Sequence, residues 1–154
     1  MTVSSYISTL RSKIGNDLLL IPSVAALIHD RHGRLLLQRK AGPEGWRLPP
    51  GGIEPGETPN DALRREVLEE TGAEVLNADL VSVLGGEAFR YRYPNGHLVE
   101  YTVIVFKCAV APTDSPCIDT EPQELRYFSA ADMPNLALPY PKALLFSGQH
   151  RSPE

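Results

Sequence analysis

The stretch GGIEPGETPNDALRREVLEETGA, residues 51–73, joins a glycine-rich turn to a short helix that carries many carboxylates. Thr58 predicts the N-cap of this helix, and Pro59 suits its first position. Asp61, three residues after the cap, predicts a variant of the capping box. Gly72 predicts the end of the helix, because glycine readily adopts the left-handed conformation found there. The stretch therefore predicts a loop that leads into a short, well-capped helix.

The glutamates of this helix fall on one side of it. At about 100° per residue, Glu66, Glu69 and Glu70 share an arc that borders the apolar Leu63 and Val67. Like charges at this spacing repel each other, and partial burial adds a desolvation cost. A divalent cation such as Mg²⁺ or Mn²⁺ would neutralise them, since hard cations prefer oxygen ligands. The alternative is a solvated acidic face without a metal.

The spacing of these residues resembles the signature of the Nudix hydrolases, G-x5-E-x7-R-E-U-x-E-E-x-G-U, where U is a bulky aliphatic residue. The chain supplies every specified position except the last, with Gly51, Glu57, Arg65, Glu66, Val67, Glu69, Glu70 and Gly72. Ala73 is a weak match at that last position, and Pro50 stands where glycine is common before the signature. The resemblance implies a Nudix-type α/β/α sandwich with a mixed central sheet. It also implies a Mg²⁺-dependent hydrolase of phosphorus-containing acid anhydrides, with Mn²⁺ as an alternative metal.

The resemblance also implies roles for the residues of the signature. Metal ligands are expected among Gly51, through its carbonyl, and Glu57, Glu66, Glu69 and Glu70. A metal held there would neutralise a substrate pyrophosphate and lower the pKa of a bound water. Arg65 is expected to pair with the carboxylates and hold them in position. The alternative for Arg65 is an ordinary helix salt bridge, worth under about 1 kcal/mol.

A general base is also expected, and its place varies within the family. If the base comes from the signature itself, Glu69 or Glu70 is the source. Otherwise it comes from a later loop, where Glu121 precedes Pro122, and Glu124 is the second choice there. Both loop residues have an alternative reading as surface acids. The catalytic candidates are therefore Glu69, Glu70, Arg65 and Glu121.

A second group of candidates lies further along the chain, where aromatic and basic residues alternate. Phe89, Tyr91 and Tyr93 alternate with Arg90 and Arg92, which in a strand places the rings and the guanidinium groups on opposite faces. Rings of this kind stack nucleobases, and arginines bind phosphate. Arg90, Tyr91 and Arg92 are therefore candidate substrate contacts. The alternative is an edge strand with aromatic packing and solvated arginines.

The rest of the chain predicts strands around the helix. An almost continuous apolar run at 18–28 indicates a buried strand, and 34–39 is expected to be its hairpin partner. The turn sequence at 94–96 predicts a hairpin that leads into a long strand. Trp46 is interpreted as a core anchor rather than a substrate contact. Further strands are expected at 80–84, 98–110 and 124–129.

The remaining titratable side chains show no spacing typical of a site. Surface positions at turns or strand ends are expected for His29, His32, His97 and Lys40. Cys108 and Cys117 lack the spacing of metal ligands and are expected to be free thiols.

Length and composition indicate one domain. The chain has 154 residues, 42% of them hydrophobic, and a formal net charge of -4. Residues 1–16 are expected to hold an N-terminal helix of the same domain, 17–148 the Nudix hydrolase domain and 149–154 a flexible tail. The first helix is interpreted as a packing element or as a contact in a homodimer. The net negative charge argues against general affinity for nucleic acid or anionic membranes, and the apolar runs are too short to span a bilayer, so a cytoplasmic location is expected.

These features favour a small-molecule substrate and leave three functions open. The first is hydrolysis of the pyrophosphate bond of a nucleoside diphosphate linked to another moiety, such as ADP-ribose. The second is a (d)NTP pyrophosphohydrolase that sanitises the nucleotide pool. The third is a catalytically silent nucleotide-sensing module, which is disfavoured because every carboxylate of the signature is present.

Overall fold

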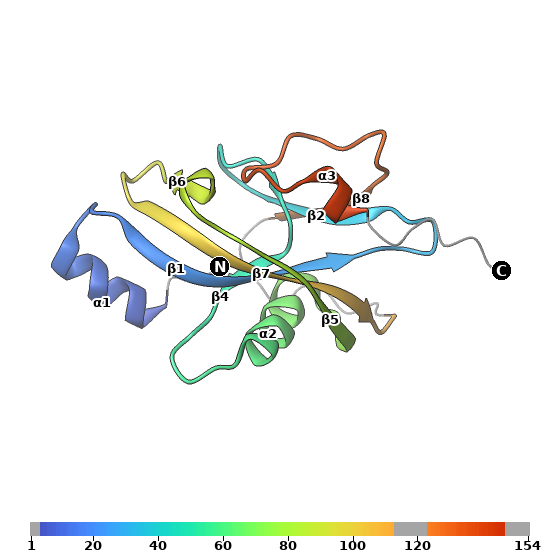
Figure 1. The fold of residues 1–154 in the computed structure, drawn as a ribbon, viewed down its shortest axis with the longest axis horizontal. Helices are drawn as coiled ribbons and strands as arrows, with labels where there is room; N and C mark the ends of the chain where they lie inside the picture. The colour runs from blue at the N-terminus through green and yellow to red at the C-terminus, as the bar shows by residue number, and fades with distance from the viewer. Residues whose placement is uncertain (1–3, 113–122, 147–154) are drawn as a thin grey trace.

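The computed structural model describes residues 4–112 and 123–146, and a five-stranded mixed sheet forms their centre (Figure 1). The strand order is β4-β1-β7-β5, and β6 also pairs with β7. The two central strands, β1 and β7, are parallel, and the other pairs in this sheet are antiparallel. The bounds are Leu19–Ile28 for β1, Pro50–Gly52 for β4, Val75–Leu84 for β5, Arg90–Arg92 for β6 and Leu98–Val110 for β7. The expected mixed central sheet is confirmed.

A second, three-stranded sheet has the order β3-β2-β8. Its strands are Trp46–Arg47 (β3), Leu35–Lys40 (β2) and Gln123–Phe128 (β8), and both pairings are antiparallel. The prediction that β2 is the hairpin partner of β1 is therefore wrong. Both edges of β1 are occupied, by β4 and by β7, and only an isolated bridge between His29 and Leu35 joins the two segments.

Helices lie on both faces of the five-stranded sheet. In Figure 1, α2 (Pro59–Thr71) lies below the sheet, and the three-stranded sheet and α3 (Lys142–Leu145) lie above it. The apolar cluster on the α2 side includes Val24, Ala26, Ile28, Leu63, Val67 and Phe106. The cluster on the other side includes Ala25, Leu27, Leu37, Val103, Val105 and Leu145. Successive residues in the second half of β1 thus point into opposite cores, which explains why residues 24–28 are all apolar.

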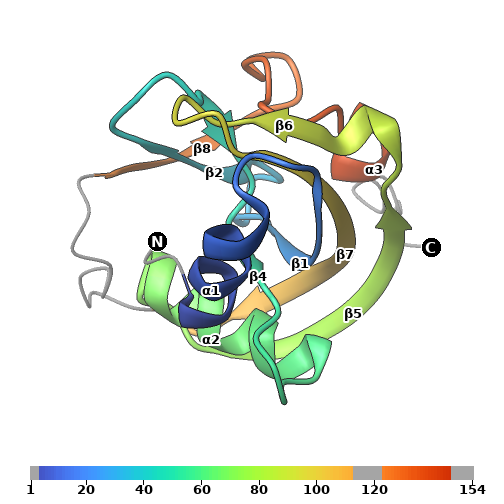
Figure 2. The same ribbon diagram turned by 90° about the vertical axis from the view of Figure 1, so that its left-hand side faces the viewer.

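The first helix, α1 (Ser5–Ile14), lies at the end of the sheet where β1 begins (Figures 1 and 2). Ser4 caps it by accepting a hydrogen bond from the Ile7 amide at 3.1 Å. Arg11 is buried, and its guanidinium donates at 2.7 Å to the carbonyl of Leu98, the first residue of β7. This bond ties α1 to the central sheet. Among the described residues, no helix is long and apolar enough to cross a membrane.

The turn into β7 has the predicted form. The Gly96 amide donates to the Tyr93 carbonyl at 2.9 Å, and Gly96 has a φ of 90°, a conformation that favours glycine. The antiparallel pair of β6 and β7 follows, as predicted. β5 starts at Val75, earlier than the expected residue 80. Trp46 is buried, and its ring meets that of Phe128 edge-on, so its core position is confirmed.

Candidate active site

Local sequence sets the bounds of α2, the helix that carries the glutamates. The Thr58 side chain accepts a hydrogen bond from the Asp61 amide at 3.1 Å, and Pro59 occupies the first turn. Gly72 ends the helix in the left-handed conformation with a φ of 75°. The cap, the first turn and the end of the helix are therefore as predicted.

The carboxylates of α2 differ in their burial. Glu66 and Glu70 lie on the buried face with Val67, and they are 5% and 1% exposed. The Glu69 side chain is 43% exposed. The helix face that carries the three glutamates therefore lies at the edge of the core. Glu66 and Glu70 are turned toward the core, and Glu69 is turned toward solvent.

Gly51 in β4 lies directly against Glu66. A Cβ atom built at Gly51 would stand 1.8 Å from Cδ of Glu66, well inside any permitted contact. Glycine is therefore required here by the close approach of a side chain from another element. The neighbouring Gly52 has no such restriction, because a Cβ there would meet no atom within 4 Å.

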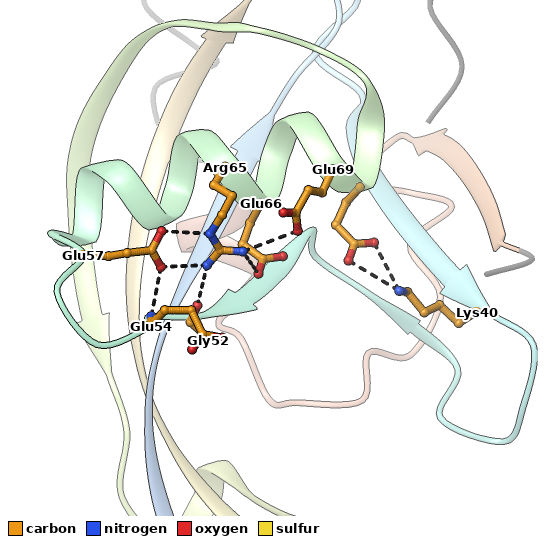
Figure 3. Close-up of polar contacts among 8 residues, drawn as sticks. Lys40, Gly52, Glu54, Glu57, Arg65, Glu66 and Glu69 are labelled. Carbon is orange, nitrogen blue, oxygen red and sulfur yellow. Dashed lines mark hydrogen bonds and ion pairs between the residues drawn. The ribbon is translucent and has the colours of Figure 1, made fainter. Parts of the chain in front are cut away.

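Arg65 is the centre of a polar network at the start of the site (Figure 3). Its Nε and Nη2 atoms donate to the two oxygens of Glu57, both at 2.8 Å. Nη1 donates to Glu66 at 2.7 Å and lies 3.4 Å from Glu69, and Nη2 also donates to the carbonyl of Gly52 at 3.1 Å. The hydrogen bonds that Arg65 donates to Glu57, and then the one that it donates to Glu66, raise the pKa of Arg65. Arg65 thus joins α2 to β4 and does more than a single helix salt bridge.

Glu66 is the member of this network whose hydrogen bonding is incomplete. Its Oε2 atom is buried and has no hydrogen-bond partner in the described part of the chain. Burial raises the pKa of its carboxyl to about 7, although the hydrogen bond from Arg65 opposes the shift. A buried acceptor left unsatisfied costs about 1–3 kcal/mol. A cation at this oxygen would therefore stabilise the site.

Lys40, at the end of β2, is buried beside Glu70, so the expectation of a surface position is wrong. Its Nζ atom lies 3.4 Å from both carboxylate oxygens of Glu70, and the two side chains are 7% and 2% exposed. Both faces of β2 are buried from Leu35 to Gln38. Lys40 lies on the face of Leu36, which packs in one cluster with Leu63 and Val67 of α2, whereas Arg39 on the other face is exposed. His29 is half-buried, and its Nε2 atom lies 2.8 Å from the carbonyl oxygen of Leu145. Leucines begin both faces of β2, so alternation in the sequence does not distinguish Lys40 from the exposed Arg39.

The donor groups of this site suit a hard divalent cation. No three His, Cys, Asp or Glu side chains within 4–112 and 123–146 are grouped as a ready metal site. The α2 glutamates instead contact Arg65 and Lys40. Carboxylate oxygens are nevertheless the ligands that Mg²⁺ and Mn²⁺ prefer, and Oε2 of Glu66 is a buried acceptor that no described residue uses. The residues therefore fit such an ion chemically.

The proposed loop bases have different outcomes. Glu121 lies outside the described residues. Glu124, in β8, forms salt bridges with Arg39 at 2.7 Å and Arg126 at 3.3 Å. These partners hold its carboxylate on the exposed side of the three-stranded sheet, whereas Lys40 on the other side contacts α2.

A pocket walled by tyrosines adjoins the carboxylate site. Its lining includes Arg47, Gly51, Gly52, Tyr91, Tyr93 and Tyr101. The rings of Tyr91 and Tyr93 meet edge-on with centroids 4.9 Å apart, and the hydroxyls of Tyr93 and Tyr101 share a hydrogen bond. β4 thus contributes to both places, because Gly51 also touches Glu66.

The candidate substrate residues divide between this pocket and its surroundings. Tyr91 lines the pocket. Arg90 instead donates to Glu100 at 2.8 Å, and Arg92 donates to the carbonyl of Gly96 at 3.0 Å. Sequence reasoning missed Arg47, Tyr101 and Tyr140, which reach the pocket from three distant segments. No local spacing links these residues, so only the folded chain identifies them as neighbours.

Comparison with known proteins identifies the family. The chain matches the NUDIX domain over residues 19–145. The RNA pyrophosphohydrolases of Yersinia enterocolitica and Yersinia pestis are 41% identical to it over 75 residues, or 47% of this chain, and the match spans only 41% of their length. The MutT protein of Methanosarcina mazei superposes with a TM-score of 0.64 at 26% identity, over 88% of this chain and 99% of that one. An ADP-ribose pyrophosphatase of Streptococcus suis shares the fold. It superposes with a TM-score of 0.58 at 23% identity, over 87% of this chain and 94% of that one. The signature on α2 and the match over residues 19–145 together show that the chain belongs to the Nudix hydrolase family.

Proposed function

We propose that this Nudix protein cleaves the pyrophosphate bond of a nucleoside diphosphate linked to another moiety, as in ADP-ribose. The observation that carries the proposal is the buried carboxylate pair of α2. Glu66 packs against Gly51 with an unsatisfied oxygen, and Glu70 is 1% exposed. A protein gains no stability from such a cluster by itself, so its place beside a pocket favours a role in chemistry.

In this proposal the residues of the site have different roles. Glu57, Glu66, Glu69 and Glu70, with the Gly51 carbonyl, would hold Mg²⁺ or Mn²⁺. When bound, such an ion supplies charge neutralisation at the diphosphate and lowers the pKa of water. Arg65 orients Glu57 and Glu66 through its hydrogen bonds.

Glu69 is the first choice for the group that takes the proton from the attacking water. Its side chain is 43% exposed, so water can reach it, whereas the Glu70 carboxylate is enclosed beside Lys40. A general base must come within hydrogen-bond reach of the water. Glu70 and Glu121 stay as alternatives for this role.

A second candidate function is the release of pyrophosphate from a 5′ triphosphate, either of a nucleotide or of an RNA end. The identity to RNA pyrophosphohydrolases favours the RNA version, although the match covers only part of those proteins. The tyrosine pocket next to β4 suits the nucleoside that the substrates of both candidate functions share.

The decisive experiment is a hydrolysis panel with product identification, in Mg²⁺ and in Mn²⁺. ADP-ribose, deoxynucleoside triphosphates and a 5′-triphosphorylated RNA oligonucleotide would be offered separately. Release of AMP and ribose 5-phosphate is the expected result. Pyrophosphate as the main product would select the second candidate, and an inert protein would remove both.

Variants of the two glutamates test the chemistry directly. We expect Glu69→Gln and Glu70→Gln each to lower kcat by about 10²-fold or more, the scale of a lost acid-base group or ligand. Circular dichroism should show an intact fold in both. Unchanged turnover in both variants would contradict the proposed mechanism.

A further inference from the structure

A second hollow lies beside the turn that joins β1 to β2, at the opposite end of the molecule from α1 (Figure 1). Its volume is about 650 Å³, against about 60 Å³ for the tyrosine pocket. Pockets that bind small molecules typically measure about 300–1,000 Å³. We call this hollow the turn pocket, and its lining includes Ile28, Arg31, Leu36, Ala73, Val110 and Tyr127.

The turn pocket is separate from the carboxylate site on α2. It shares no lining residue with the tyrosine pocket. Leu36 lies on the same face of β2 as Lys40, four residues earlier. At about 3.3 Å per residue in a strand, Leu36 is about 13 Å along β2 from the contact between Lys40 and Glu70. The turn pocket is therefore a different place on the molecule from the proposed site of hydrolysis.

The floor of the turn pocket is apolar. Ile28, Leu36 and Ala73 belong to it, and they are 1%, 6% and 6% exposed. Leu36 pairs with Tyr127 in the register of β2 and β8, which places the tyrosine ring beside the leucine. Tyr127 is itself 37% exposed. A hydrocarbon group that covered this floor would be stabilised by leaving water.

The mouth of the turn pocket is positively charged. Arg31 and His32 are exposed there, and Asp30 is the one acid among the described residues of the lining. Both oxygens of Asp30 are used within the turn. Oδ1 accepts from the amides of His32 and Arg34 at 2.9 Å, and Oδ2 accepts from Nε of Arg34 at 2.7 Å. Asp30 therefore neutralises Arg34 and fixes the turn that presents Arg31.

Arg31 is the cation that keeps donors for a ligand. Its Nε atom donates to Nε2 of His32 at 3.3 Å, and no carboxylate in 4–112 or 123–146 pairs with it. The two terminal nitrogens of a guanidinium can bind a carboxylate or a phosphate through two parallel hydrogen bonds. The whole chain has a net charge of -4, so this mouth differs in sign from the molecule around it.

We propose that the turn pocket binds a small organic acid with an apolar body, whose carboxylate or phosphate group pairs with Arg31. The body would cover the floor, and the acid group would reach the mouth. An inorganic anion would leave the apolar floor in water, and a neutral hydrocarbon would leave Arg31 without a partner. The inference goes beyond the proposed function and requires no nucleotide.

The test is a binding measurement in EDTA, so that no metal ion holds an anion at α2. Isothermal titration would compare 2-naphthoate with 2-naphthalenemethanol, which has the ring without the charge, and with acetate, which has the charge without the ring. We expect 2-naphthoate to bind at least about tenfold more tightly than either, the scale of a hydrogen bond to a charged group. 2-Naphthyl phosphate in the same series identifies the preferred acid group, and tight binding of either acid supports the inference.

Variants of exposed arginines test the role of the mouth. Arg31→Met should weaken the binding of 2-naphthoate by about tenfold or more. Arg31→Lys should give an intermediate loss, because lysine keeps the charge but not the planar fork. Arg126→Met is the matched control and should bind as the wild type does. Arg126 is an exposed neighbour of Tyr127 in β8, but it pairs with Glu124 at 3.3 Å and does not line the turn pocket.

Amide signals in NMR spectra locate the bound acid. 2-Naphthoate should shift the signals of Arg31, Ala73 and Tyr127 and leave those of Gly51 and Glu66 in place. Shifts confined to the tyrosine pocket, or equal affinity in Arg31→Met and the wild type, would overturn the inference. Binding of 2-naphthalenemethanol as tight as that of 2-naphthoate would also overturn it, and would indicate an apolar pocket that does not recognise an acid.

The result is separate from that of the hydrolysis panel. A protein that hydrolyses none of the nucleotides but binds 2-naphthoate through Arg31 would lose the proposed function and keep this inference. A protein that hydrolyses nucleotides and binds 2-naphthoate no better than acetate would lose this inference alone.

Discussion

Glu66 is the residue at which the two sides of the site meet. One of its oxygens accepts from Arg65, and its Cδ atom stands where a side chain on Gly51 would begin. This contact explains why position 51, the first glycine of the signature, must be glycine when Glu66 occupies the helix.

Gly51→Ala tests this contact with a single methyl group. Because the new Cβ would lie 1.8 Å from Cδ of Glu66, the carboxylate must move. Displacement of a reacting group by about 1 Å can cost about 10²-fold in rate, and we expect a loss of kcat on that scale. Gly52→Ala is the control, since its Cβ would meet nothing within 4 Å. Similar kcat values for the two variants would contradict the explanation.

Lys40 allows a test of stability at the same scale. Lys40→Met removes the ammonium group 3.4 Å from a carboxylate that is almost fully buried. Removal of one partner from a buried ion pair typically costs about 3–5 kcal/mol of unfolding free energy. Arg39→Met, which breaks an exposed pair with Glu124, should cost under about 1 kcal/mol. Urea denaturation measures both, and Glu70→Gln added to Lys40→Met should recover part of the loss.

Among the elements, α2 was predictable together with its bounds, whereas β2 was predictable as a strand but its pairing partner was not. Thr58, Pro59 and Gly72 set the bounds of α2 through local hydrogen bonds and backbone preferences, so a short sequence window contains the information. The partner of β2 is β8, far along the chain, and three consecutive leucines at the start of β2 fit any buried strand. Pairing between distant strands depends on which edges remain open, which no local pattern records.

The same distinction separates the two parts of the site. The glutamates of α2 repeat at helical spacing, so their common face follows from the sequence. The pocket wall is assembled from β3, β6, β7 and the segment before α3. Tertiary structure alone brings Arg47 and Tyr140 together, and the arginines of β6, which the alternating pattern selected, face other partners.

His29 links the end of β1 to α3 and makes this link sensitive to pH. Burial lowers the pKa of His29 below its usual 6.5; the Leu145 carbonyl and Asp30 oppose the shift, and Lys107 adds to it. The Nδ1 atom is buried without a hydrogen-bond partner among the described residues, so the protonated ring would carry an unsatisfied donor.

The folded protein therefore disfavours protonated His29, and the unfolded chain takes up this proton more readily. The contribution to stability is present above the usual pKa of 6.5 and is lost as the pH falls through that value. We expect the free energy of unfolding to fall from about pH 7 to pH 5 by at most about 1.4 kcal/mol per pH unit from this group. His29→Gln should flatten that slope in urea titrations at several pH values. A slope unchanged by the substitution would assign the effect to other groups.

For the whole molecule, the fold does not depend on the proposed metal site. Two apolar clusters build the core, and neither depends on the α2 carboxylates. We therefore expect the protein to keep its circular dichroism spectrum in EDTA. Added Mg²⁺ or Mn²⁺ should raise Tm, because an ion that binds only the folded state stabilises that state. The stabilisation is about 2.7 kcal/mol when the concentration of the free ion is a hundred times Kd.

Glu66→Gln is the control for this metal effect. It preserves the shape of the side chain but removes the charge beside Gly51, so the rise in Tm on adding the ion should shrink. A rise as large as that of the wild type would mean that the ion binds elsewhere on the molecule.

The position of β4 has a consequence for how such a protein can diversify. Its two glycines contact Glu66 and Arg65 of α2. The same glycines also border the tyrosine pocket, whose wall is made of side chains from other strands. Under the proposed function, substitutions in that wall would change which molecules are accepted while the groups that break the bond are inherited intact. Separate inheritance of these two properties would let a single ancestral scaffold give rise to enzymes with many different substrates.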